Sequence, residues 1–188
     1  MRKLLLSCLL GLGIGANAQT VLFEDSFESY TDFAIANVGN WTLRDIDLST
    51  TYGFQGIQFA NSGAAKSFQV FNNTTTTPPL EPTEMADWSA RTGNKMMVAF
   101  ASTTPSNNDW MISPQVAMPS VGTSELSFWA KATDAGYGDE KFRVYVSTTG
   151  TQVADFTALA AVKTINTGTT WVEYKYDLSA YAGQQIHV

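Results

Sequence analysis

Strict alternation of apolar and polar residues in the second half of the chain is the feature that most constrains its fold. Residues 126–131, 141–147 and 170–177 all alternate in this way. Successive side chains of a β-strand point to opposite faces, so a period of two predicts half-buried strands. The apolar faces are Leu126, Phe128 and Ala130 in the first segment, Phe142, Val144 and Val146 in the second, and Val172, Tyr174 and Tyr176 in the third.

Shorter strand patterns fill the rest of the chain. They lie at residues 21–27, 56–59, 66–71, 96–101, 110–116 and 161–165. A single helical turn is expected at 178–182, and residues 72–91 and 134–140 are expected to form long loops. Many short strands separated by turn residues predict an all-β fold, a sandwich or jelly roll of antiparallel sheets.

The N-terminus has the pattern of a secretory signal peptide. Arg2 and Lys3 precede an apolar run, and Ala16-Asn17-Ala18 offers small residues where a signal peptidase cleaves. The run is interrupted by glycines and is shorter than the roughly 20 apolar residues of a membrane-spanning helix. Leu5-Leu6-Ser7-Cys8 is similar to the box before a lipidated cysteine, but the apolar stretch before Cys8 is too short, so the later site is favoured. We predict a signal peptide at 1–18 and one domain at 19–188, secreted or displayed on the outer-membrane surface.

The charge of the predicted mature chain excludes some partners. The formal net charge is -6, and loss of Arg2 and Lys3 makes it more negative by two. Nucleic-acid binders need a basic surface, and anionic lipid repels an acidic domain. Calcium, neutral sugars and basic proteins suit this charge, although simple solubility explains it equally well. We expect no nucleic-acid partner and no membrane insertion of the mature chain.

The chain lacks the residues of the common catalytic sites. His187 is the only histidine and Cys8 the only cysteine, and Cys8 lies in the predicted signal peptide. Ser-His-Asp or Cys-His catalysis and zinc or copper sites are therefore disfavoured. Paired carboxylates for glycoside hydrolysis remain open, but no pair is singled out. The sequence predicts a protein that is not an enzyme.

Oxygen ligation is the site chemistry that the sequence favours. Acidic residues cluster in three places, namely Glu24, Asp25 and Glu28, then Asp45 and Asp47, then Asn107, Asn108 and Asp109. Calcium takes six to eight oxygens from such groups. Each cluster alone is more typical of a turn, in which Asn and Asp bond their own backbone, than of a metal site. Alternation along residues 21–28 also puts Asp25 on the face opposite Glu24 and Glu28.

Two aromatic residues are candidate ligand contacts. Most tryptophans of a sandwich lie in its core, but Trp88 lies in the long polar loop 72–91. Tyr137 lies between Gly136 and Gly138 in the second long loop. Binding residues are concentrated on loops of this kind, so we predict that Trp88 and Tyr137 are exposed and contact a ligand.

The order of the motifs resembles the cleaved-adhesin and choice-of-anchor J domains. The resemblance rests on Phe23-Glu24-Asp25-Ser26-Phe27-Glu28, Asn40-Trp41, Asp45-Ile46-Asp47 and Asn108-Asp109-Trp110-Met111-Ile112-Ser113-Pro114. It continues through Leu126-Ser127-Phe128-Trp129-Ala130-Lys131, Val146-Ser147-Thr148-Thr149-Gly150, Trp171-Val172-Glu173-Tyr174 and Asp177-Leu178-Ser179-Ala180-Tyr181-Ala182-Gly183. It covers nearly all of the predicted mature chain.

This resemblance implies a jelly-roll β-sandwich of two antiparallel sheets, related to MAM domains. Such modules occur in proteins exported by type IX secretion, including the haemagglutinin/adhesin regions of gingipains. It also implies a non-catalytic adhesion module that binds protein or glycan and holds structural calcium. The family pattern makes Glu28 a metal ligand and matches Asp45 and Asp47, and with Asp25 these form the predicted metal set.

Members of that family continue into a further strand of the Ile-Asp-Asp-Val type. Residues 184–188 begin as a strand and stop without a turn or a polar tail. We therefore expect the domain to be truncated before its closing strand. The alternative function is an accessory domain of an exported peptidase or other hydrolase whose catalytic region lies downstream.

Overall fold

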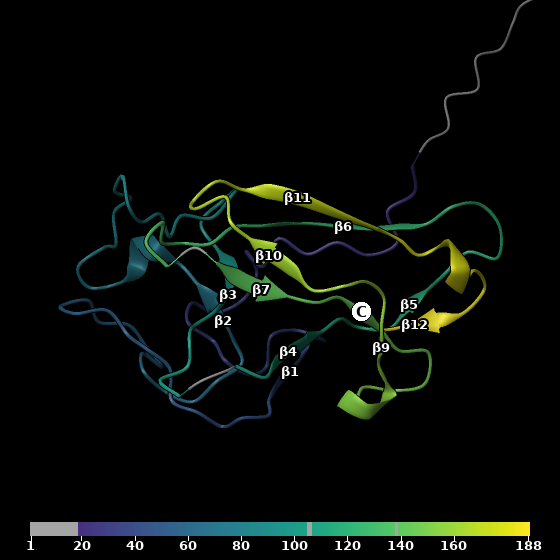
Figure 1. The fold of residues 1–188 in the computed structure, drawn as a ribbon, viewed down its shortest axis with the longest axis horizontal. Helices are drawn as coiled ribbons and strands as arrows, with labels where there is room; N and C mark the ends of the chain where they lie inside the picture. Colours follow the sequence, from purple (N-terminus) through teal and green to yellow (C-terminus); the bar gives the residue numbers. More distant parts are fainter. Residues whose placement is uncertain (1–18, 105–106, 138) are drawn as a thin grey trace, which may run out of the picture.

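The computed structural model describes residues 19–104, 107–137 and 139–188, so the predicted signal peptide lies outside the described residues. The strands are β1 (Thr42–Asp45), β2 (Phe68–Phe71), β3 (Met96–Ala99), β4 (Asp109–Ile112), β5 (Val116–Ala117), β6 (Glu125–Ala130), β7 (Glu140–Phe142), β8 (Tyr145–Val146), β9 (Thr157–Ala158), β10 (Lys163–Ile165), β11 (Val172–Asp177) and β12 (Gln185–Ile186). Short 3-10 turns lie at η1 (Asn73–Thr75), η2 (Val153–Asp155) and η3 (Ser179–Tyr181). All strand pairs are antiparallel (Figure 1).

One series of pairings links strands that lie far apart in the sequence. β10 and β9 pair with β7 and β8, and Ser147 bonds through its backbone to His187 just after β12. β12 pairs with β5. The chain that enters β5 comes from β4 through Ser113 and Pro114, and β4 pairs with β1. β12 is therefore a central strand of this layer.

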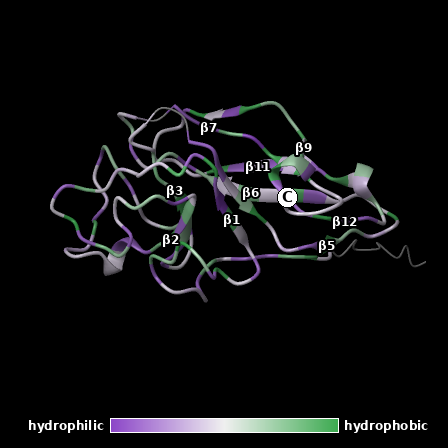
Figure 2. Ribbon diagram, turned by 90° about the horizontal axis from the view of Figure 1, so that it is seen from below, coloured by the Kyte–Doolittle hydropathy of each residue, from purple (hydrophilic) through white to green (hydrophobic). Residues whose placement is uncertain are grey.

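The second layer consists of β6 and β11, which pair along six residues from Val172↔Ala130 to Asp177↔Glu125. Its inner face carries the predicted apolar positions, and alternation along the ribbon can be followed in Figure 2. Leu126 and Leu178 from this layer pack with Val146 and Ile186 from the first. Apolar side chains enclosed between two layers are the core of a sandwich. The predicted all-β jelly-roll class is confirmed.

A second core lies under the long loops. Phe33, Phe71, Met96, Val98 and Phe100 are buried together, and β2 and β3 supply three of them. Phe71 contacts the rings of Phe33, Phe59 and Phe100 with centroid separations of 5.4 to 5.8 Å. Residues of the predicted long loop 72–91, among them Leu80 and Trp88, pack against this aromatic cluster. The cluster therefore holds in place a loop for which the alternation pattern predicts no strand.

Several strand predictions need correction. Residues 21–27 alternate in sequence but form no strand among the described residues, because no neighbouring segment pairs with their backbone. The strand expected at 56–59 is reduced to one bridge, Gln58↔Thr77. The strand expected at 110–116 divides at Pro114, which has no N–H for the ladder. β1 was not predicted, because Thr42-Leu43-Arg44-Asp45 shows no clear apolar face.

Candidate functional site

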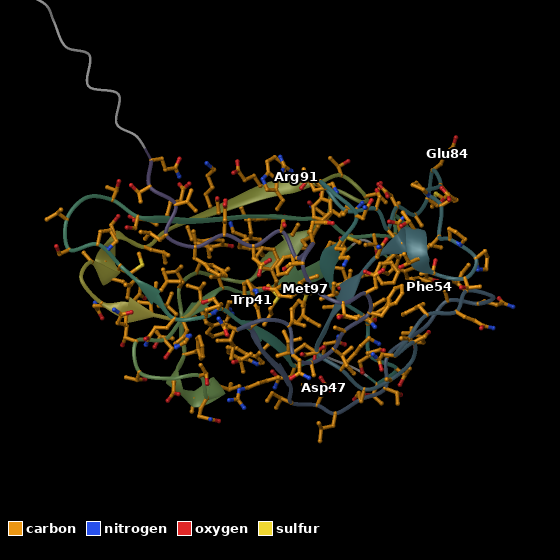
Figure 3. All side chains as sticks on the ribbon, turned by 180° about the vertical axis from the view of Figure 1, so that it is seen from behind. Trp41, Asp47, Phe54, Glu84, Arg91 and Met97 are labelled. Carbon is orange, nitrogen blue, oxygen red and sulfur yellow. The ribbon has the colours of Figure 1, made fainter. Side chains whose placement is uncertain are left out.

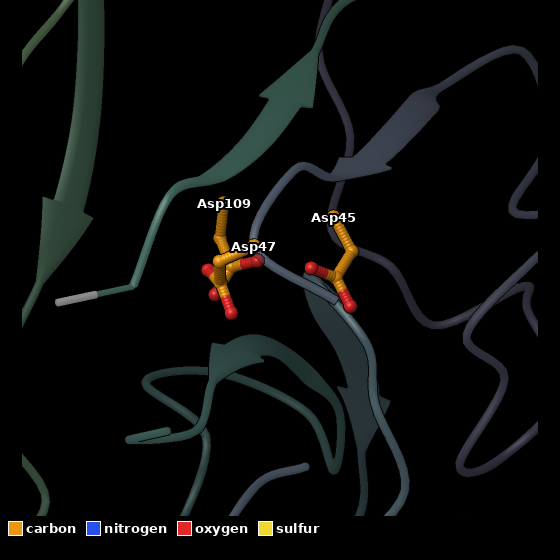
Figure 4. Close-up of side chains that lie close together, drawn as sticks. All are labelled: Asp45, Asp47 and Asp109. Atoms are coloured by element: carbon orange, nitrogen blue, oxygen red, sulfur yellow. The ribbon is translucent and has the colours of Figure 1, made fainter. Parts of the chain in front are cut away.

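Three aspartates converge where β1 and β4 meet at one edge of the sheet. The pairing register sets Asp45 directly opposite Asp109, and Asp47 lies in the turn that follows β1. One carboxylate oxygen from each of the three lies within 4.8 Å of the others. Figure 4 shows Asp47 and Asp109 side by side, with the Asp45 carboxylate turned toward them.

Hydrogen bonds to the backbone fix the turn that carries Asp47. Asp45 Oδ1 accepts the N–H of Leu48 at 2.7 Å, and Asp47 Oδ2 accepts the N–H of Asn108 at 2.6 Å. Leu48 has a φ of 55°, in the left-handed region that non-glycine residues rarely adopt. The N–H of Asn108, with help from Ser49, lowers the pKa of Asp47. Asp47 is therefore held ionised beside the other two carboxyl groups.

The carboxyl group of Asp109 is partly buried beside two other carboxyl groups. Its Oδ2 accepts the amide of Asn107 at 2.9 Å, whereas its Oδ1 is buried without a hydrogen-bond partner. Burial first, and then repulsion by Asp47 and Asp45, raises the pKa of Asp109 to about 7. A buried oxygen without a partner is costly, and like charges directly opposite on paired strands are destabilising.

The donor set of this cluster fits a hard divalent cation. Calcium binds carboxylate oxygens, and a bound cation would both offset the mutual repulsion and occupy the free oxygen of Asp109. Zinc and copper prefer imidazole and thiolate groups, which this cluster does not contain. Asp45, Asp47 and Asp109 are thus the residues that would hold calcium.

The structure does not bring Asp25 into this cluster. Asp25 Oδ1 accepts the N–H of Phe27 at 2.8 Å, and its Oδ2 accepts the hydroxyl of Tyr30 and the indole N–H of Trp41. These bonds tie the irregular segment before Phe27 to the start of β1. The hydrogen bond to Asp25 also raises the pKa of Tyr30 to about 12.

Glu28 also lies apart from the three aspartates and holds a different loop. Its Oε1 accepts the backbone N–H groups of Asn94 and Lys95, at 2.9 and 2.7 Å. Gly93 passes so close that an added Cβ would lie 2.4 Å from this oxygen. The roles of Asp25 and Glu28 as metal ligands stay predictions.

Glu28→Ala should lower the free energy of unfolding by about 1–3 kcal/mol, because two backbone N–H groups lose a charged acceptor. The loss should be equal in calcium and in EDTA, as measured by urea unfolding of the purified domain. Ser29→Ala, at the exposed neighbouring residue, is the matched control. A loss confined to calcium-containing buffer would show that Glu28 is a ligand instead.

The structure places Trp88 half-buried against the aromatic core rather than on an open loop, and its role as a ligand contact stays a prediction. Its ring stacks on Phe100 at 5.5 Å and contacts Phe54 and Phe71 at 4.5 and 5.6 Å. Trp88 is therefore part of the aromatic core, although it lies in a polar stretch of sequence. Tyr137, by contrast, is 81% exposed.

Asp109 is the site residue that the sequence prediction left out of its metal set. It belongs to one of the three acidic clusters in the sequence, but it is far from Asp45 along the chain. Only the pairing of β1 with β4 brings them together. The motif that begins at Asn108 could have indicated Asp109 as a ligand, but only if its strand had been predicted to pair with residues 42–45.

The fold and the site together define an all-β sandwich module with a carboxylate cluster at the meeting ends of two paired strands. Among the described residues, no helix is both long and apolar enough to cross a membrane.

Comparison with known families identifies the module. The sequence profile of the Cleaved Adhesin Domain family matches residues 78–185, more than half of the chain. The chain belongs to the cleaved adhesin domain family, as the sequence motifs predicted.

Relatives and solved structures agree with this assignment. Hemagglutinin A of Porphyromonas gingivalis is 35% identical over 92 residues, which are 45% of this chain and 4% of that protein. Lys-gingipain W83 of the same species is 34% identical over 92 residues, again 45% of this chain and 5% of the relative. The crystal structure of the K2 cleaved adhesin domain of Lys-gingipain matches with a TM-score of 0.56 at 19% identity, over 88% of this chain and 86% of that domain. The K1 domain from P. gingivalis W83 matches with a TM-score of 0.52 at 20% identity, over 87% and 83%.

Proposed function

We propose that this chain is a secreted or surface-displayed, non-catalytic binding module that attaches to a protein or glycan ligand and is stabilised by calcium. Its membership of the cleaved adhesin domain family is the observation that carries the proposal. The segments it matches are small parts of a haemagglutinin and of gingipains, as expected for one module of a larger surface protein.

The calcium part of the proposal is supported by the cluster of Asp45, Asp47 and Asp109. Opposed carboxylates on paired strands are unfavourable without a counter-charge, and the free Oδ1 of Asp109 is an unused ligand atom. A cation at this position would join the turn after β1 to the start of β4. Calcium would thus stiffen a loop region at one edge of the sandwich.

Tyr137 is the proposed ligand contact. It lines a cleft of about 440 Å³ with Gly136, Asp139, Asn166 and Gly168. An exposed tyrosine offers a ring face for stacking and a hydroxyl for hydrogen bonding.

A protein and glycan array probed with the domain in calcium and in EDTA tests the proposal. We expect specific retention on at least one ligand, and isothermal titration should show calcium binding. Asp45→Asn combined with Asp47→Asn should abolish the calcium signal, whereas Asp155→Asn, outside the cluster, should retain it. A domain that binds neither calcium nor any arrayed ligand would disprove the proposal.

A second candidate function is an accessory domain of an exported peptidase. Segments of Lys-gingipain and of Gingipain R1 match this chain, the latter at 39% identity over 62 residues, 33% of this chain and 3% of that protein. Sequencing the gene beyond the codon of Val188 tests the two. A peptidase domain there would favour the accessory role, and repeats with a sorting domain would favour the adhesin.

A further inference from the structure

Two loops join to form one extremity of the molecule, which we name the acidic tip and define as residues 81–87, 133–137 and 139–140. The N–H of Asp87 donates to Thr133 O at 2.9 Å, and the N–H of Ala135 donates to Met85 O at 2.7 Å. Ala86 and Asp134 form the bridge between these bonds. The tip is thus a short antiparallel ladder that extends from the sandwich, and Glu84 points away from the body in Figure 3.

The acidic tip exposes two large apolar side chains that nothing in the described structure covers. Met85 is 59% exposed and Tyr137 is 81% exposed. The ladder places them near each other, because Met85 bonds to Ala135, two residues before Tyr137. The cleft beside Tyr137 continues this surface toward Asn166. Adjacent exposed apolar groups of this kind are typical of interaction surfaces.

The charge around these side chains has one sign. The tip carries Glu81, Glu84, Asp134, Asp139 and Glu140 as carboxylates without a salt-bridge partner in the described structure, and residues 81–90 and 132–140 contain no Lys or Arg.

The basic side chains nearest in sequence pair with only one carboxylate of the tip, that of Asp87. Lys131 is only 1% exposed and pairs with Asp87 at 3.0 Å. Arg91 lies over the Trp129 ring, 3.8 Å from its centroid. Lys141 follows Glu140 within β7 and so points to the opposite face. The field at the tip therefore attracts cations.

We propose that the acidic tip docks a cationic, extended segment of a protein partner in which Lys or Arg alternates with apolar residues. The cations meet the carboxylate rim and the Tyr137 ring, which attracts a cation over its face. The apolar residues meet Met85, whose flexible thioether adapts to varied shapes. This inference rests on the proposed binding function, because it names the class of partner.

The test measures binding of a short synthetic peptide that alternates lysine with tryptophan, and of its glutamate counterpart, by biolayer interferometry. The immobilised domain should bind the lysine peptide and not the glutamate peptide, and added salt should weaken binding. Glu84→Lys should weaken it about 10-fold, because one rim charge is reversed. Glu24→Lys, which makes the same charge change away from the tip, should weaken it less than about 2-fold.

A second pair of variants tests the apolar contacts. Met85→Ser should weaken binding about 5-fold, whereas Val121→Ser, at a side chain that is 80% exposed elsewhere, should not. Equal effects of Glu84→Lys and Glu24→Lys, or equal binding of the two peptides, would overturn the inference. Retention of the domain on a neutral glycan, unaffected by the tip variants, would also overturn it while leaving the proposed function intact.

Discussion

Asp109→Asn should abolish stabilisation by calcium and, in EDTA, should make the domain more stable at pH 7 than the unaltered chain. Both effects follow from the placement of the Asp109 carboxyl beside Asp45 and Asp47, with one oxygen free for a cation. At [Ca²⁺] of about 100 times Kd, the unaltered domain should gain about 2.7 kcal/mol. The variant should show none of that gain.

The pH dependence of stability in EDTA follows from the direction of the pKa shift. The pKa of Asp109 is raised from 3.8 to about 7 in the folded chain. Between these pH values the folded chain holds a proton that the unfolded chain has released, so stability falls as the pH rises through this interval. Solvent reaches part of the cluster, so we expect a fall on the order of 2 kcal/mol rather than the full value of the shift.

Urea unfolding at pH of about 4, 5.5 and 7, with EDTA and with calcium, measures both effects. Calcium should remove the fall in stability with pH, because the cation replaces the proton on Asp109. Asp109→Asn should remove the same fall in EDTA. Glu81→Gln, at an exposed carboxylate outside the cluster, should retain the behaviour of the unaltered domain. A fall of equal size in Asp109→Asn would assign the pH dependence to other groups.

Trp88→Ala should destabilise the domain far more than truncation of the exposed Tyr137. The indole is enclosed by Phe54, Phe71 and Phe100, and truncation of such a side chain costs about 3–5 kcal/mol. Trp88 retains some exposure, so the lower end of that range is expected. Tyr137→Ala should change the unfolding free energy by less than about 0.5 kcal/mol.

Trp88→Phe separates packing from ligand contact. It keeps an aromatic ring in the core and should recover more than half of the stability that Trp88→Ala loses. Binding on the array should follow the folded fraction in both variants if the ring acts through packing against the core. An unchanged unfolding midpoint for Trp88→Ala would contradict the core assignment.

The sequence predicted the layer of β6 and β11 because both strands keep one apolar face along their length. Phe128, Tyr174 and Tyr176 alternate with polar residues, and the Phe128 ring stacks on both tyrosines across the pair. A period of two reveals such a strand without knowledge of its partner. The same pattern at residues 21–27 was misleading, because a strand also needs a neighbour to pair with its backbone.

The carboxylate cluster could be predicted only in part. Asp45 and Asp47 are near neighbours in sequence, so local spacing identified them as a candidate pair of ligands. Asp109 joins them through a long-range strand register that a single sequence does not encode locally. Trp88 was misplaced for a related reason, since a polar loop in sequence is folded over an aromatic core in space.

The central position of β12 has a consequence for how the domain forms. Ile186 and His187 lie between Val116 on one side and Ser147 on the other. Until residues 185–188 have left the ribosome, these two flanks have no backbone to bond, and the layer stays divided. Contacts between segments so distant in sequence also form slowly. This layer is therefore completed only once β12 has been synthesised and can pair on both of its sides.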